Sequence, residues 1–177
     1  MTLLHGSNLV IIDIDLTKSR RRTDFGLGFY LINKLGDARE WATRKASFYG
    51  GLPTVTRYEL NNAILREAKH LRFDDATLDW LYFVKQNRER KNTQNSHLPE
   101  PRHDYDSVSG PIADDKVADV VDRFCAGEVT AETALSEIRV IPNVFQFSLH
   151  TATALKFVKT IDYQQCKNGK WTDWIET

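Results

Sequence analysis

The stretch Thr23–Leu31, TDFGLGFYL, decides the fold that this sequence predicts. Its second half is aromatic and apolar, which indicates a buried strand over Phe25–Ile32. Gly26 and Gly28 indicate a turn, because glycine adopts positive φ angles without strain. The pair lacks the third glycine and the strand-then-helix setting of a dinucleotide fingerprint. The stretch therefore predicts a turn leading into a buried strand that carries Tyr30.

Two further short apolar segments are predicted to form strands beside this one. Thr2–Leu4 leads into a His-Gly-Ser turn, and Val144–Leu149, VFQFSL, carries a glutamine between aromatic residues. Taken singly, each polar residue has an ordinary explanation: a hydrogen-bonded structural histidine, a core tyrosine or a strand glutamine with a satisfied amide. Taken together, we expect His5, Tyr30 and Gln146 to meet in one cleft.

The composition indicates a globular protein of one domain, residues 1–177. Hydrophobic residues make up 41% of the chain and aromatic residues 11%, enough to bury a core. Twenty-four Lys and Arg balance twenty-four Asp and Glu, so net charge favours no polyanionic partner. Cys125 and Cys166 lack the spacing of a metal site and fit a reducing compartment. Leu9–Ile14 is too short to span a membrane and no secretory signal opens the chain, so we expect a cytoplasmic protein.

The rest of the chain predicts strands and helices without regular βαβ alternation. Helices are expected over Gly36–Tyr49, Asp75–Arg90 and Asp114–Cys125, after the N-cap Thr130 and over Thr151–Val158, and strands over Thr54–Leu60 and Tyr105–Ser109. The polar segment Lys91–Asp104, which includes His97 and His103, is predicted to be a long exposed loop. The fold class is therefore α+β with a mostly antiparallel or split sheet.

Five sequence blocks, taken in order, resemble a known family. They are LHGS at Leu4–Ser7, DFGLGFYL at Asp24–Leu31, EWA at Glu40–Ala42, YDSVSGPIADD at Tyr105–Asp115 and QFSLHTATAL at Gln146–Leu155. The chain resembles, roughly from Leu3 to Lys159, a bacterial domain-of-unknown-function family (three-nine-nine-zero). That family is usually placed in the ADP-ribosyltransferase superfamily, on its His-Tyr-Glu branch. The resemblance implies a split, mostly antiparallel β-sheet core with flanking helices.

The resemblance also implies an NAD site. Carried over residue by residue, the superfamily histidine falls on His5, the tyrosine on Tyr30 and the third position, commonly Glu, on Gln146. The backbone of Gly6 is expected to hold the nicotinamide carboxamide, with Ser7 beside it. The remaining NAD-binding positions are expected at Arg22, Asp24, Phe25 and Gly28.

These residue types suit the cleavage of NAD. A tyrosine face holds a cationic pyridinium ring by stacking and cation–π attraction worth ~0.5–2 kcal/mol. A neutral imidazole binds a ribose hydroxyl, and cleavage of the nicotinamide–ribose bond resembles glycoside hydrolysis in its oxocarbenium character. Gln146 cannot act as a base, so we expect transfer of a single ADP-ribose. Asp24, Asp114 or Asp115 are candidates for the missing carboxylate, although the latter two also suit a helix N-terminus.

Two other groups of residues have both a functional and an ordinary interpretation. The basic stretch Lys18–Arg22 is either a solvated loop or a contact to the NAD pyrophosphate or a nucleic-acid backbone. Trp171 and Trp174, near Lys167 and Lys170, either pack against the domain or stack a base.

The resemblance favours a mono-ADP-ribosyltransferase that uses NAD as co-substrate and modifies RNA, DNA or protein. It further suggests the toxin of a toxin–antitoxin or phage-defence system, with an antitoxin protein as partner. An NAD glycohydrolase and a catalytically inactive domain that binds NAD or a partner protein are the alternatives.

Overall fold

The computed structural model describes residues 1–88, 103–112, 115–140 and 142–177, without the side chains of residues 115 and 116. Within these residues the protein has an α+β fold with nine strands and six helices, which confirms the predicted class. The strands are β1 (Thr2–Ser7), β2 (Phe29–Ile32), β3 (Thr54–Leu60), β4 (His70–Arg72), β5 (Ser107–Pro111), β6 (Phe145–Leu149), β7 (Val158–Lys167), β8 (Lys170–Trp171) and β9 (Ile175–Glu176). The helices are α1 (Leu35–Tyr49), α2 (Ile64–Glu67), α3 (Leu78–Arg88), α4 (Asp115–Ala126), α5 (Ala131–Glu137) and α6 (Ala152–Leu155), with a 3₁₀ turn, η1, at Leu16–Lys18.

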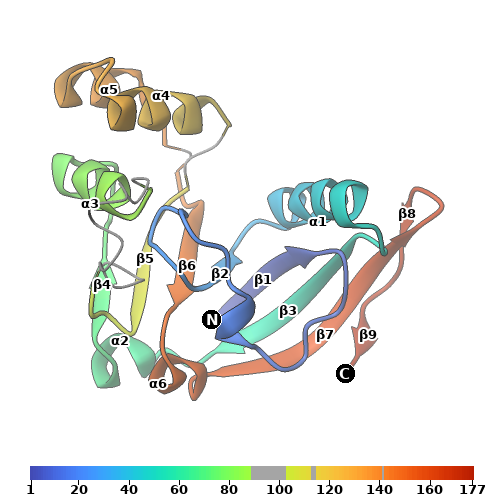
Figure 1. The fold of residues 1–177 in the computed structure, drawn as a ribbon. Coiled ribbons are helices and arrows are strands. Elements are labelled where there is room, and N and C mark those ends of the chain that lie inside the picture. Colours follow the sequence, from blue (N-terminus) through green and yellow to red (C-terminus); the bar gives the residue numbers. More distant parts are fainter. Residues whose placement is uncertain (89–102, 113–114, 141) are drawn as a thin grey trace.

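The sheet is nearly split between β2 and β1. The strand order is β4-β5-β6-β2-β1-β3-β7-β8, with β9 also on β7, and all these pairs are antiparallel except β4 with β5. Strands β1 and β3 share a register of six residue pairs, whereas β1 and β2 share the single pair Leu4–Ile32. The two strand groups on either side of this junction run in clearly different directions (Figure 1).

Helices cover the two halves of the sheet separately. Helices α3, α4 and α5 lie together near β4 and β5, whereas α1 lies over β1 and β3 (Figure 1). The first group buries a cluster that includes Phe25, Trp80, Val108 and Val121. Helix α1 packs on β1 through Ala38 and Ala42, both fully buried. The small alanine side chains allow this close approach.

Several predicted boundaries are wrong for identifiable reasons. The His-Gly-Ser sequence continues β1 to Ser7 instead of forming a turn, because Gly6 provides the room that α1 requires. Phe25 lies in a turn before β2 and not in the strand. Strand β7 is not indicated by any apolar run. More and less exposed positions alternate along it, and many of its residues, which pair with β3, are polar.

The C-terminal tryptophans pack against the domain, as the ordinary interpretation of them predicts. Trp171 and Trp174 contact the small cluster under α1. The guanidinium of Arg39 lies 5.0 Å from the ring centroid of Trp171, and that of Arg57 lies 4.2 Å from Trp174. Both distances are within the range of cation–π attraction. No helix in the described part of the chain is long and apolar enough to cross a membrane.

Replacement of Gly6 by Ala is expected to destabilise the fold. A Cβ at this position would lie 2.1 Å from the carbonyl oxygen of Ala38, so α1 would have to move off β1. We expect a loss of about 1–3 kcal/mol in the free energy of unfolding, measured by urea denaturation.

Gly36→Ala is the matched control on α1, where an added Cβ meets nothing within 4 Å. It should be neutral or stabilising by up to about 1 kcal/mol. Equal unfolding midpoints for the Gly6 variant and the unmodified protein would contradict the close contact of α1 with β1.

Candidate functional site

The three residues expected at the site lie on three neighbouring strands. Gln146 is on β6, Tyr30 on β2 and His5 on β1, which are adjacent in the sheet. Tyr30 is opposite Ser148 and Ile32 is opposite Gln146 in the β2–β6 register. Because side chains alternate along a strand, Tyr30 and Gln146 project from the same face of the sheet.

His5 occupies the position at which the β1–β2 ladder stops. Its Nδ1 lies 2.7 Å from the backbone oxygen of Tyr30, and its ring stacks on Phe29 with centroids 4.4 Å apart. Its Nε2 lies 3.3 Å from Nζ of Lys45, which extends from α1. The imidazole therefore replaces backbone pairing between β1 and β2.

These contacts define the chemical state of His5. A carbonyl oxygen only accepts hydrogen bonds, so Nδ1 carries the proton and donates it to Tyr30. Nε2 is then an acceptor, to which the Lys45 ammonium donates. Burial, reinforced by the positive charge of Lys45, lowers the pKa of His5 to about 3. The ring is therefore neutral near pH 7, with an acceptor nitrogen directed at Lys45.

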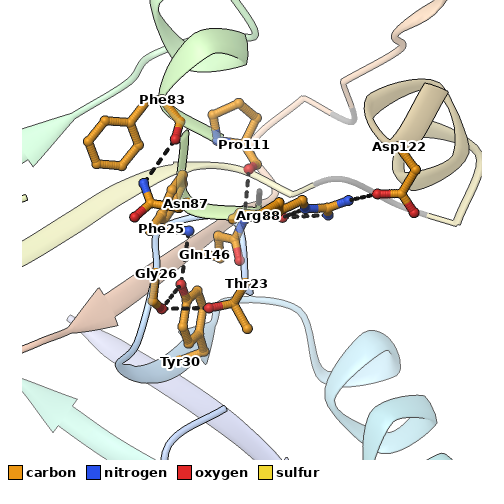
Figure 2. A network of polar contacts seen from close by, with 11 residues as sticks. Thr23, Phe25, Gly26, Tyr30, Phe83, Asn87, Arg88, Pro111, Asp122 and Gln146 are labelled. Carbon is orange, nitrogen blue, oxygen red and sulfur yellow. Dashed lines mark hydrogen bonds and ion pairs between the residues drawn. The ribbon is translucent and has the colours of Figure 1, made fainter. Parts of the chain in front are cut away.

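The Tyr30 hydroxyl belongs to the preceding turn. It donates to the carbonyl oxygen of Gly26 at 2.8 Å and accepts from the backbone N–H of Phe25 at 2.9 Å (Figure 2). Thr23 Oγ1 donates to the same Gly26 oxygen at 2.5 Å. Burial raises the pKa of Tyr30 well above its usual value. The Tyr30 hydroxyl is thus un-ionised and holds the turn in place, and the side chain as a whole is half-buried.

A buried ionic network holds Gln146. Its Nε2 donates to Oδ2 of Asp24 at 2.7 Å and to the carbonyl oxygen of Pro111 at 3.2 Å. Oδ1 of Asp24 accepts from Arg88 at 2.8 and 2.5 Å. Arg88 also donates to the exposed Asp122 at 2.9 Å (Figure 2). Both oxygens of Asp24 are occupied, so it cannot act as a base while the network is intact.

The three candidate side chains do not form a single cluster. Phe29 and Tyr30 are consecutive in β2 and project to opposite faces, and His5 stacks on Phe29. The imidazole therefore reaches Tyr30 through its backbone oxygen and not through its ring. Gln146 and Tyr30 are linked through the turn, since Gln146 binds Asp24 and Tyr30 binds the next two residues.

The residues expected to bind NAD have different environments. Phe25 is fully buried in the helical core cluster, which identifies it as a packing residue. Ser7 is buried at the end of β1, and Gly28 packs against His150, whose Nδ1 would lie 2.6 Å from an added Cβ. Arg22 is exposed and has a φ of 60°, an uncommon backbone conformation for a residue with a side chain.

Asp114 and residues 91–102, including His97, lie outside the described residues. Asp115 begins α4, in agreement with its expected place at a helix start, but its side chain is not described. His103 is half-buried instead of exposed, because its Nε2 donates to the Phe25 carbonyl oxygen at 2.8 Å. His150 Nδ1 likewise donates to the Leu27 oxygen at 2.8 Å. Two imidazoles thus support the glycine turn, a role that no sequence spacing indicated.

The described residues also contain a hollow of about 540 Å³ at the opposite end of β1. It is lined by Met1, Glu59, Leu60, Asn61, Asn62, Lys156, Phe157, Val158 and Lys159. None of the candidate residues contributes to it. No group of three or more His, Cys, Asp or Glu side chains suited to a metal ion occurs in the described part of the chain.

Asp24→Asn is expected to destabilise the protein strongly. The substitution leaves the half-buried Arg88 without its close carboxylate and sets an amide N–H₂ against that of Gln146. We expect a loss of about 3–5 kcal/mol in the free energy of unfolding. Asp122→Asn removes the exposed partner of the same guanidinium and should cost less than about 1 kcal/mol. Similar losses in the two variants, measured by urea denaturation, would contradict the central place of Asp24.

The neutrality of His5 predicts a pH effect on stability. With the pKa of His5 at about 3 in the fold and 6.5 ordinarily, the unfolded chain takes up a proton between these values that the folded chain does not. Protonation of His5 in the unfolded chain therefore lowers the free energy of unfolding as the pH falls below 6.5. The ¹⁵N spectrum of the imidazole should retain the Nδ1–H tautomer from pH 7 to 5, while the urea-unfolded chain titrates normally. A folded-state transition above pH 6 would refute this assignment.

Comparison with known proteins identifies a family but no characterised relative. The sequence model of the family described as "Protein of unknown function (DUF3990)" matches residues 1–160. Neither the curated proteins nor the solved structures compared with the chain give a match. The matched range contains β1, β2 and β6, and hence His5, Tyr30 and Gln146. This chain belongs to the DUF3990 family of proteins of unknown function.

Proposed function

We propose that this protein is a mono-ADP-ribosyltransferase that cleaves NAD and transfers ADP-ribose to a macromolecule. The superfamily resemblance of its sequence blocks suggests the reaction. The observation that carries the proposal is the junction where β1 and β2 share one residue pair and His5 binds the Tyr30 backbone, with Gln146 on the next strand, β6. A junction of this kind leaves polar groups between strands that a bound dinucleotide can use.

The state of His5 supports a role in binding ribose. A neutral imidazole with Nδ1–H bound to a carbonyl leaves Nε2 as the acceptor for a ribose hydroxyl. In the free protein this nitrogen accepts from Lys45. The low pKa of His5 maintains the acceptor across the physiological pH range.

Gln146 and Asp24 limit the chemistry that is available. The Gln146 amide carries no charge, and Asp24 is bound by Arg88 and Gln146. Neither group can take a proton from an acceptor with the network intact. The protein would then contribute positioning and electrostatic stabilisation at the ribose. Because it offers no base, it would transfer ADP-ribose only to an acceptor that loses its proton readily, and each acceptor would be modified once. This combination favours single transfer over chain elongation.

The acceptor is proposed to be a nucleic acid such as RNA, with a protein side chain as the alternative. The exposed arginines that precede the glycine turn support this preference, because they form a basic surface segment. The proposed cellular role is that of a toxin in a toxin–antitoxin or phage-defence system, controlled by an antitoxin protein. The loss of a catalytic carboxylate also suits an inactive NAD-binding domain, and the experiment below separates these functions.

Incubation of the purified protein with adenylate-labelled NAD and bacterial extract tests the reaction. We expect free nicotinamide and label in a macromolecular fraction that nuclease digestion releases. His5→Ala should reduce nicotinamide release about tenfold or more, because it removes the ribose-binding nitrogen. Lys34→Met, which removes an exposed lysine paired with Asp37, is the control and should retain activity.

Each alternative has its own readout. Release of label by protease identifies a protein acceptor, and free ADP-ribose without labelled macromolecule identifies an NAD glycohydrolase. Saturable NAD binding without nicotinamide release identifies an inactive binding domain and refutes the proposed reaction. Thermal unfolding of the His5 variant, recorded in parallel, distinguishes lost chemistry from lost fold.

A further inference from the structure

Lys45 lies beside His5, and the positive charge of Arg20 acts on Lys45. Lys45 extends from α1 and is half-buried, with its Nζ 3.3 Å from Nε2 of His5. Arg20 is exposed and close enough to act on Lys45 electrostatically. Neither forms an ion pair within the described residues, whereas nearby basic residues do: Lys18 pairs with Asp15, Lys34 with Asp37 and Arg44 with Glu40.

The arrangement is electrostatically unfavourable in the absence of an anion. Like charges repel, and a half-buried ammonium has lost part of its hydration. Burial, together with the charge of Arg20, lowers the pKa of Lys45 to about 8. An anion bound to these cations would restore charge balance. Relief of the unfavourable electrostatic energy in the free protein would then contribute to the affinity for the anion.

The packing of α1 places Lys45 at this point. Ala38 and Ala42 pack on β1 at Gly6, and Lys45 follows about one turn later on the same side of the helix. The long side chain then reaches the junction between β1 and β2. Lysine is flexible about four side-chain bonds, so its ammonium can leave His5 without movement of the helix.

We propose that Lys45, beside His5, forms a pyrophosphate-binding subsite to which the charge of Arg20 contributes. The inference rests on the proposed function, in which the pyrophosphate belongs to NAD. In the free protein the Lys45 ammonium donates to His5 Nε2 and keeps this nitrogen occupied. When a dinucleotide binds, the ammonium donates to a phosphate oxygen, and the released Nε2 accepts a ribose hydroxyl. Lys45 thereby couples phosphate binding to the availability of His5.

Titration with inorganic pyrophosphate, followed by calorimetry, tests the subsite without turnover. We expect Lys45→Met to raise the Kd about tenfold or more, since a charge-assisted hydrogen bond is lost. Arg20→Met should raise it by a smaller factor, because this side chain is exposed. Lys45→Arg should restore most of the affinity, and Lys34→Met, which removes an exposed lysine paired with Asp37, should leave it unchanged within about twofold.

A measurement on the unmodified protein removes dependence on the folding of the variants. NMR of protein whose lysines carry ¹³C at Cε follows the titration of Lys45, and saturation with pyrophosphate should raise its pKa. The ¹⁵N chemical shift of His5 Nε2 should change as the Lys45 ammonium leaves it. Unchanged signals at both positions, or an unchanged Kd in folded Lys45→Met, would overturn the subsite.

The two proposals fail separately. Pyrophosphate binding that depends on Lys45, in a protein that leaves NAD intact, would refute the proposed reaction and keep the subsite as a phosphate site. Turnover of NAD with no effect of Lys45→Met on pyrophosphate affinity would refute the subsite and keep the reaction.

Discussion

The carboxylate of Asp24 joins the two parts of this protein. It accepts from Arg88, the last residue of α3, and from Gln146 of β6. A buried carboxylate is costly unless it is paired, and a buried guanidinium is equally so. The helical group and the centre of the sheet are therefore held in one relative position by a shared charge. The turn that contains Asp24 also receives Tyr30, His103 and His150, which orders it from several sides.

The second constraint is the junction of β1 and β2. A ladder that stops after one residue pair leaves backbone groups in need of partners, and the His5 imidazole satisfies the Tyr30 carbonyl. That single bond defines the tautomer and presents Nε2 to Lys45, while burial and the Lys45 charge keep the ring neutral. The structural role of His5 thus creates the chemical property that a ligand would use. Residues with both roles are hard to assign from either feature alone.

Much of the secondary structure could be predicted locally. Strand β3 is rich in β-branched residues and matches its expected bounds, and α4 follows its apolar periodicity closely. Thr130 caps α5 as expected, since its side chain accepts from the Thr133 N–H. Strand β7 was missed because its half-exposed alternation has meaning only beside β3. The bounds of β1 were wrong because glycine there serves contact with α1 and not a turn.

The sequence by itself determined the fold class and the family, and it singled out three polar candidates that lie on strands β1, β2 and β6. It did so because periodicity, caps and ordered motifs are local properties of a chain. Only the tertiary structure decided that Asp24 is already bound, that His5 contacts the backbone and not the ring of Tyr30, and that Lys45 reaches the junction. These facts depend on contacts between residues 25 to 122 positions apart or on the packing of α1, and no spacing along the chain encodes them.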